Sequence, residues 1–179
     1  MTGPKSGRRK RPMNDNLSIL SNIILFEDFK ENVEVLGKIE DLFTERDAKK
    51  GDVIIREEKE GDELFIIKSG CVRILKNTLQ DENYTVVILS ADQNIFFGEI
   101  GLLLNDKRSA TVVAEVDSTF LVTNQKKFTE FGEREPYIAL MITRKIARIL
   151  ASRLTKTNQD VVTLFSALVS EIDSQGMML

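Results

Sequence analysis

The sequence predicts an α+β protein in which helices flank an antiparallel β-sandwich or β-roll. Three observations predict this fold class. Apolar residues recur every three or four positions between residues 14 and 42, short β-rich runs follow within 43–124, and the helical period returns over 125–173. Because no long helix separates neighbouring β-rich runs, the pattern is not that of a parallel βαβ sheet.

The N-terminal region divides into an arm and a helical segment. Residues 1–13 carry five basic residues and no acidic ones, and almost nothing apolar, so we expect a disordered basic arm. A solvated tail is the preferred interpretation of this arm, and contact with nucleic acid or an anionic membrane is the alternative. Over 14–42 the spacing predicts two helices, with a turn near residues 26–28.

Six short runs of β-branched and aromatic residues predict strands in the central region. Turn signals that contain Gly51, Gly61 and Gly70 separate the first of these runs. The predicted strands cover 53–55, 64–67, 72–75, 84–89, 110–113 and 119–122. Strands at this spacing are typical of an antiparallel sandwich or roll.

The C-terminal region is again helical. We expect a short helix over 125–132 and a long one that begins near Pro136, because proline suits the first turn of a helix. Asn158 or Asp160 is expected to cap a further helical segment. The apolar seam of that segment predicts a parallel homodimer through the C-terminal helices, and it consists of Val161, Leu164, Phe165, Leu168 and Ile172.

The composition excludes most familiar catalytic chemistries. The 179 residues include no histidine, which excludes a Ser-His-Asp triad, a Cys-His pair and any His-ligated metal or haem site. The single cysteine, Cys71, excludes an intramolecular disulfide and Cys-rich metal sites. We expect Cys71 to be a buried structural thiol rather than a redox sensor. The sequence therefore predicts a protein that is not an enzyme and that holds no metal or cofactor.

No segment of the sequence has the properties of a membrane anchor or an export signal. Apolar runs stay well short of the roughly 18–20 residues that span a bilayer, and no hydrophobic stretch follows the basic N-terminus. We therefore expect a cytoplasmic protein.

One interruption of the β-rich region, residues 97–111, has the residue types of an anion site. Gly98 precedes an acidic residue, Glu99, that begins a short apolar turn of helix, and Arg108 lies just before the next strand. Unpaired N–H groups at a helix start attract an anion, and an arginine binds two phosphate oxygens at once. Because Glu99 would repel a phosphate, it is expected to accept a hydrogen bond from another part of the ligand, such as a sugar hydroxyl. These features together describe a nucleotide ligand.

Residues 97–111 read FGEIGLLLNDKRSAT, which resembles the phosphate-binding cassette of the cyclic nucleotide-binding domain family. The segment KKGDVIIREEKEGDELFIIKSGCVRIL is similar to the early strands of that family, and the resemblance extends over roughly residues 17–158. It implies N-terminal helices at 14–42, a jelly-roll-like β-roll of about eight strands at 43–124, and C-terminal helices at 125–173 for lid and dimer contacts. The turn at 90–95 departs from the family pattern, because it is longer and lacks glycine.

The resemblance also implies a role for each residue of the cassette. Glu99 would accept a hydrogen bond from the ribose 2′-hydroxyl, and Arg108 would pair with the exocyclic phosphate oxygens. The remaining contacts would come from Gly98, Ile100, Gly101, Ser109 and Ala110, and the wall around base and sugar from Ile74, Val86 and Val87. Serine at position 109 is compatible with both cAMP and cGMP, so the choice of ligand stays open.

The expected function is that of a stand-alone regulatory sensor that binds cAMP or cGMP and signals through its C-terminal helices to an unknown downstream protein. The alternative is a ligand-free scaffold that acts as a dimeric protein-interaction module. Sequence-specific DNA binding is disfavoured, since only about twenty residues follow Thr157 and a winged helix-turn-helix needs several more elements.

Overall fold

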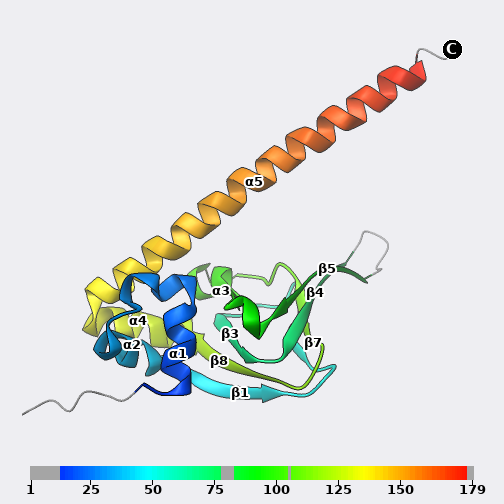
Figure 1. The fold of residues 1–179 in the computed structure, drawn as a ribbon. Coiled ribbons are helices and arrows are strands. Elements are labelled where there is room, and N and C mark those ends of the chain that lie inside the picture. Colours follow the sequence, from blue (N-terminus) through cyan, green and yellow to red (C-terminus); the bar gives the residue numbers. More distant parts are fainter. Residues whose placement is uncertain (1–12, 78–82, 105, 177–179) are drawn as a thin grey trace, which may run out of the picture. The chain divides into compact units, whose positions relative to one another are not determined.

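Eight antiparallel strands in two four-stranded sheets form the predicted β-roll (Figure 1). The computed structural model describes residues 13–77, 83–104 and 106–176, so the basic arm predicted at 1–13 lies outside the described residues except for Met13. One sheet has the strand order β1-β8-β3-β6 and the other β2-β7-β4-β5. The strands are β1 (Thr44–Ala48), β2 (Val53–Ile55), β3 (Glu63–Ser69), β4 (Cys71–Asn77), β5 (Asn83–Ser90), β6 (Phe96–Phe97), β7 (Thr111–Ala114) and β8 (Ser118–Asn124). The expected fold class is confirmed.

Two of these strands, β1 and β6, have no counterpart among the six predicted runs. In β1 only Ala48 is buried, because the strand lies at the edge of its sheet and presents Thr44, Glu45, Arg46 and Asp47 to solvent. Its position depends on pairing with β8, from Thr44 opposite Val122 to Ala48 opposite Ser118. A strand with one buried residue carries no apolar alternation, and a strand of two residues is too short to show any.

The N-terminal helical segment contains two α-helices and a 3₁₀ helix: α1 (Asp15–Asn22), η1 (Ile24–Phe29) and α2 (Val33–Glu40). Asparagine side chains cap both α-helices, since Asn14 Oδ1 accepts from the Leu17 N–H at 2.8 Å and Asn32 Oδ1 accepts from the Val35 N–H at 3.1 Å. The 3₁₀ helix takes the place of the predicted turn, and the second α-helix begins only after Asn32.

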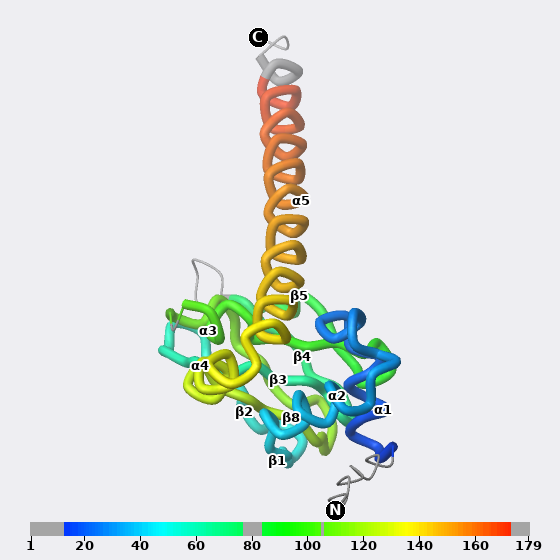
Figure 2. The backbone as a smooth tube through the Cα atoms, turned by 90° about the vertical axis from the view of Figure 1, so that its left-hand side faces the viewer, coloured from blue at the N-terminus to red at the C-terminus, as the bar shows by residue number. Residues whose placement is uncertain are grey.

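The C-terminal region contains α4 (Gln125–Arg134) and the 41-residue α5 (Pro136–Gly176), which continues without interruption past Asn158 (Figure 2). The predicted cap at Asn158 or Asp160 is therefore wrong. Threonine hydroxyls on either side of this point donate to carbonyl oxygens within the helix, Thr155 to Ala151 at 3.0 Å and Thr163 to Gln159 at 2.9 Å. With no proline or glycine nearby, capping preference alone does not end a helix. The chain forms two compact units, Met1–Leu140 and Met141–Leu179.

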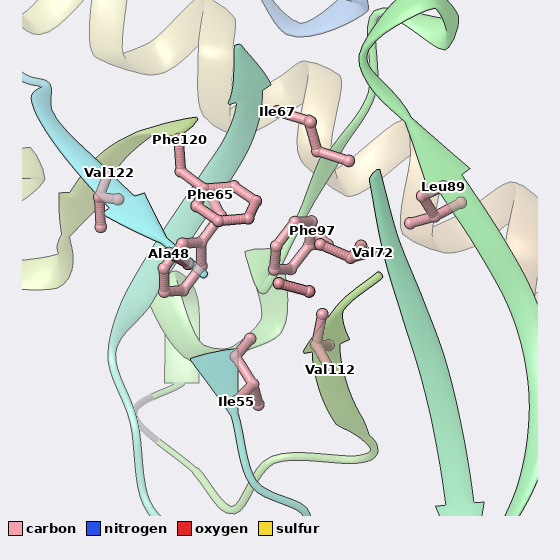
Figure 3. Close-up of a cluster of buried hydrophobic side chains, with 11 residues drawn as sticks. Ala48, Ile55, Phe65, Ile67, Val72, Leu89, Phe97, Val112, Phe120 and Val122 are labelled. Atoms are coloured by element: carbon pink, nitrogen blue, oxygen red, sulfur yellow. The ribbon is translucent and has the colours of Figure 1, made fainter. Parts of the chain in front are cut away.

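Three phenylalanines lie at the centre of the buried cluster between the two sheets (Figure 3). The rings of Phe65 and Phe97 stack with centroids 5.1 Å apart, and Phe120 meets both edge-on at 6.1 and 6.0 Å. Phe97 immediately precedes Gly98, so the core fixes the position at which residues 97–111 begin.

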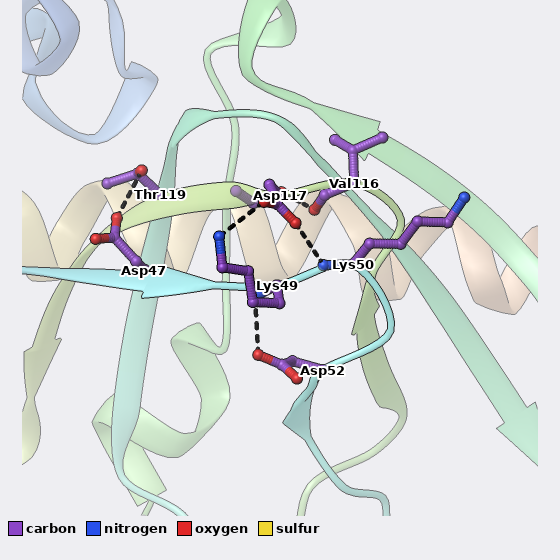
Figure 4. A network of polar contacts seen from close by, with 8 residues as sticks. Asp47, Lys49, Lys50, Asp52, Val116, Asp117 and Thr119 are labelled. Carbon is purple, nitrogen blue, oxygen red and sulfur yellow. Dashed lines mark hydrogen bonds and ion pairs between the residues drawn. The ribbon is translucent and has the colours of Figure 1, made fainter.

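A polar network joins the turn after β1 to the turn between β7 and β8 (Figure 4). The carboxylate of Asp117 accepts from the Lys50 N–H at 2.9 Å and pairs with Lys49 Nζ at 2.9 Å. Asp52 accepts from the Lys49 N–H at 2.8 Å, and Asp47 from the Thr119 hydroxyl at 2.8 Å. At this exposed end of the roll, polar contacts rather than apolar packing therefore connect the two turns.

Truncation of the central aromatic cluster is expected to destabilise the roll strongly. Phe120→Ala should lower the free energy of unfolding by about 3–5 kcal/mol, because Phe120 is fully buried and contacts two other rings. Urea unfolding followed by circular dichroism measures this change. Tyr137→Ala, at an exposed ring in the same unit, is the control and should stay within about 0.5 kcal/mol.

The Asp117 network predicts a stability difference that depends on pH. The hydrogen bond from Lys49, and then that from the Lys50 N–H, hold the pKa of Asp117 below its ordinary value of 3.8. A carboxyl whose pKa is lowered by folding stabilises the protein above its unfolded pKa and loses that effect as pH falls through the folded pKa. Thermal midpoints of the wild type and Asp117→Asn should differ at about pH 7 and converge towards about pH 2. A constant difference at every pH would contradict this account.

Candidate functional site

The site is built around the turn from β6 into the short helix α3 (Glu99–Leu104). Gly98 occupies this turn with φ +84°, a conformation that residues with a Cβ rarely adopt. An added Cβ would also lie 2.6 Å from the carbonyl oxygen of Glu63. Glycine is therefore required here, and the turn makes Glu99 the first residue of α3.

Glu99 and Arg108 are buried charged residues of the site, with only 5% and 8% of their surface exposed. Burial lowers the pKa of the Arg108 guanidinium, and the negative charges of Glu63, Asp62 and Glu99 act in the opposite direction. The two residues predicted to bind opposite edges of the ligand are thus close enough for their charges to interact.

Both the side chain and the main chain of Arg108 are held by hydrogen bonds. Nη1 donates to the carbonyl oxygen of Gly98 at 3.2 Å, and Nη2 donates to that of Glu63 at 2.9 Å. The Arg108 N–H donates to Lys59 O at 2.9 Å, and the Glu58 N–H donates to Arg108 O at 3.0 Å. The segment between β2 and β3 therefore holds the main chain of Arg108, and carbonyl oxygens of the turn before α3 and of the first residue of β3 hold its guanidinium.

Three glycines surround this guanidinium, and we call Gly61, Gly98 and Gly101 the arginine cradle. A Cβ added at Gly61 would lie 2.5 Å from Nε of Arg108, one at Gly101 2.5 Å from Nη1, and one at Gly98 3.1 Å from Nη1. Gly61 lies in one of the predicted turn signals, but its φ is not positive, so the turn itself does not require a glycine there. The structure gives a different reason for this glycine, which is the room that the guanidinium needs.

The predicted wall residues lie on β4 and β5. Ile74 pairs with Val87. Two residues along each strand, Val72 and Leu89 also pair and are buried, so all four side chains project from the same face of the sheet. Val86 lies at the irregularity next to this pair, where the register shifts. Ile74 packs against the core, whereas Val86 and Val87 are exposed.

The other residues predicted to contact the ligand lie along the cassette itself. Ile100 and Ser109 are exposed, and Ala110 is half-buried directly before β7. Gly101 belongs to the arginine cradle. The backbone thus brings Gly98, Glu99, Gly101 and Arg108 together, and the other three residues lie next to them in the sequence.

Glu63 is a site residue that the sequence analysis missed. Its carbonyl oxygen accepts from Arg108, while its carboxylate pairs with Arg46, whose Nη1 lies 3.1 Å from Oε2. Glu63 also pairs with Asn124 at the end of β8, and Asn124 caps α4 by accepting from the Lys127 N–H at 2.9 Å. No side-chain pattern could have revealed the hydrogen bond from Arg108 to Glu63, because its acceptor is a main-chain carbonyl oxygen.

The long turn before the cassette achieves its reversal without glycine. It contains a 3₁₀ turn, η2 (Ala91–Gln93), in which the side chains of Ser90 and Gln93 form a capping box. Asn94 then takes the left-handed conformation, with φ 50° and ψ 48°. Asparagine tolerates this region better than most residues, which allows the turn to reverse direction without a glycine.

The arginine cradle predicts an energetic coupling between Gly61 and Arg108. Gly61→Ala should lower the stability of the wild type but have little effect in an Arg108→Ala background, because all three nearest atoms to the added Cβ belong to the Arg108 side chain. Urea unfolding of the four proteins should give a coupling of about 0.5–3 kcal/mol. Gly101→Ala is the matched control, since its Cβ also meets the Gly61 carbonyl oxygen at 2.3 Å and Arg108→Ala cannot relieve that contact. Equal losses from Gly61→Ala in both backgrounds would contradict the role of the cradle.

Within residues 13–77, 83–104 and 106–176, no helix combines the length and hydropathy that crossing a membrane requires. In the same part of the chain, no group of three or more His, Cys, Asp or Glu side chains is arranged to hold a metal ion.

Known proteins resemble this chain in sequence and in fold. The cAMP-dependent protein kinase type II regulatory subunit of Drosophila melanogaster is 28% identical over 163 residues, which cover 88% of this chain and 39% of that protein. The human cGMP-dependent protein kinase 2 is 31% identical over 126 residues, or 68% of this chain and 16% of that protein. The chain thus spans less than half the length of these relatives.

The fold has solved counterparts, among them the catabolite activator protein of Thermus thermophilus. That structure aligns with a TM-score of 0.69 and 26% identity, covering 79% of this chain and 62% of its own. The family model of the cyclic nucleotide-binding domain matches residues 45–135, from the edge strand β1 to the end of α4. This match includes both sheets, Glu99, Arg108 and the arginine cradle, and the chain therefore belongs to the cyclic nucleotide-binding domain family.

Proposed function

We propose that this chain is a cytoplasmic regulatory sensor that binds cAMP or cGMP in its β-roll and is not an enzyme. The observation that carries the proposal is the buried Arg108, whose main chain is held at two points and whose guanidinium lies in a cradle of three glycines. A buried cation is costly unless an anion or oriented dipoles stabilise it. A site that immobilises an arginine in this way is suited to bind a phosphate.

The remaining residues of the site suit the other parts of a cyclic nucleotide. A guanidinium has five N–H donors, so a cyclic phosphate can accept from those that do not point to Gly98 O and Glu63 O. Glu99 would accept a hydrogen bond from the ribose 2′-hydroxyl. The backbone of Gly98, Ile100 and Gly101 would also contact the ligand. Ser109 and Ala110 would add a hydroxyl and an amide donor. Ile74, Val86 and Val87 would line base and sugar, and the exposed apolar surface of the last two would be covered by the ligand.

The names of the relatives support this ligand class without selecting one nucleotide. One relative is a cAMP-dependent kinase regulatory subunit and another is a cGMP-dependent kinase. We propose that binding changes the position of the C-terminal helices, that the chain forms a homodimer through them, and that a downstream protein recognises the change. A ligand can shift such an equilibrium only by binding one state more tightly than the other.

Calorimetric titration with cAMP and with cGMP tests the binding site. The wild type should bind at least one nucleotide, and Arg108→Ala should weaken that binding by about 10- to 100-fold, because charge-assisted hydrogen bonds to the phosphate are lost. Lys107→Ala is the matched control, since it removes the same charge from the adjacent, exposed residue and should keep the affinity of the wild type. No heat with either nucleotide, or equal affinity in Arg108→Ala, would overturn the proposal.

A ligand-free interaction module is the second candidate function. It is favoured by the two carbonyl oxygens that accept from Arg108, because they partly satisfy the guanidinium within the protein itself. Thermal unfolding separates the two candidates, since a ligand at 100 times its Kd stabilises a protein by about 2.7 kcal/mol. A scaffold would show no shift at millimolar cAMP or cGMP.

A further inference from the structure

A lysine and a tyrosine continue the predicted ligand wall along β4 and β5. Ile74 of the wall pairs with Val87, and beyond a shift in register Lys76 pairs with Tyr84. Alternate residues of a strand share a face, and so do residues that pair across two strands. Lys76 and Tyr84 therefore project from the same face of the sheet as Ile74 and Val87.

A β-bulge brings the tyrosine to this face. At Val86 the strand β5 advances by two residues while β4 advances by one. In a regular strand Tyr84 and Val87, three positions apart, would project from opposite faces. The extra residue turns Tyr84 to the side of Val87, and 51% of its surface is exposed there.

The lysine lies level with the end of the cassette. In the ladder between β4 and β7, Leu75 pairs with Thr111. The next residue of β4, Lys76, is therefore level with Ala110, which is one of the proposed ligand contacts. From β7 across β4 to β5 the distance is two strand spacings, roughly 10 Å. That distance is comparable with the length of a cyclic nucleotide, so a ligand with its phosphate at the cassette extends its base towards Lys76 and Tyr84.

The ammonium group of Lys76 lies close to the segment that holds the arginine. Its Nζ is 3.8 Å from Oε1 of Glu57, and the following residue, Glu58, donates its N–H to the carbonyl oxygen of Arg108. A separation of 3.8 Å is too long for a hydrogen bond, so this ion pair does not use up the three donors of the ammonium group. The Lys76 side chain is 46% exposed and that of Glu57 only 14%, so it is the cation that a ligand meets here.

A lysine in this place distinguishes the two purine bases. An ammonium group has donors and no acceptor. Guanine offers two acceptors, N7 and O6, on the edge where adenine has the acceptor N7 and an amino donor. We propose that Lys76 donates to this edge of the base and selects cGMP over cAMP, while the ring of Tyr84 packs against the base of either nucleotide. This inference rests on the proposed function, because it concerns the same ligand site.

Calorimetric titration of the full chain with three nucleotides tests the role of Lys76. The wild type should bind cGMP about 5- to 10-fold more tightly than cAMP, and Lys76→Met should remove this preference by weakening cGMP alone. Cyclic inosine monophosphate has the O6 and N7 of guanine without its amino group, so it should lose as much affinity in Lys76→Met as cGMP does. Lys76→Arg keeps N–H donors at this position and should keep the preference.

Arg73→Met is the matched control, since it removes the same charge from β4 but on the opposite face of the sheet, and it should leave all three affinities unchanged. A wild type that binds cAMP as tightly as cGMP would overturn this inference and leave the proposed function standing. An unchanged preference in Lys76→Met, or equal losses for cGMP and cAMP, would do the same. A chain that binds no nucleotide would overturn both proposals.

Tyr84→Ala measures the second contact. It should weaken cGMP and cAMP alike by about 5- to 10-fold, because the base loses its aromatic partner. Tyr84→Phe keeps the ring and should bind both nucleotides as the wild type does. Full affinity in Tyr84→Ala would show that the base does not reach this part of β5 and would overturn the assignment of Tyr84.

Discussion

The burial of one guanidinium sets the conditions that the rest of the site has to meet. Arg108 is charged and almost fully buried, so the surrounding chain must supply oriented acceptors and enough room for it. The acceptors are two backbone carbonyl oxygens that come from distant parts of the sequence, Gly98 and Glu63. The room comes from glycines, because a single methyl group at Gly61 or Gly101 would collide with the side chain. Local backbone, sheet pairing and glycine placement thus serve the same group.

The aromatic core supports this arrangement from the other side. Phe97 stacks on Phe65 in the centre of the roll, and the chain passes from Phe97 directly into Gly98 and Glu99. A well-packed ring has few alternative positions, so the turn that begins the cassette is held by the core as well as by its own conformation. The packing of the core and the position of the proposed ligand site therefore depend on the same short segment.

The sequence predicted those parts of the fold that depend on side-chain pattern. Buried strands such as β3 and β8 alternate or accumulate apolar residues, and the cassette was recognised from an acid and an arginine at a characteristic spacing. The edge strand β1 was missed, because β8 rather than its own polar residues holds it in place. The expected break near Asn158 was wrong for a related reason, since a capping preference is weak compared with the hydrogen bonding of a continuous helix.

The part of the site that could not be predicted acts through the main chain. A carbonyl oxygen has the same chemistry in every residue, so neither Glu63 as an acceptor nor the spatial role of Gly61 leaves a mark on the sequence. Only the folded backbone shows which peptide groups point at Arg108. This explains why residue types sufficed to locate the cassette but not to describe what holds its arginine.

The position of Glu63 has a consequence for how α4 is placed. The peptide group that holds the guanidinium belongs to the residue that pairs with Asn124, and the side chain of Asn124 fixes the first turn of α4. Beside it, the Gln125 N–H donates to the carbonyl oxygen of Asp62 at 3.1 Å. Arg108 and α4 are therefore both hydrogen-bonded to the adjacent residues Asp62 and Glu63. A displacement of either the arginine or the helix changes hydrogen bonds of these same two residues.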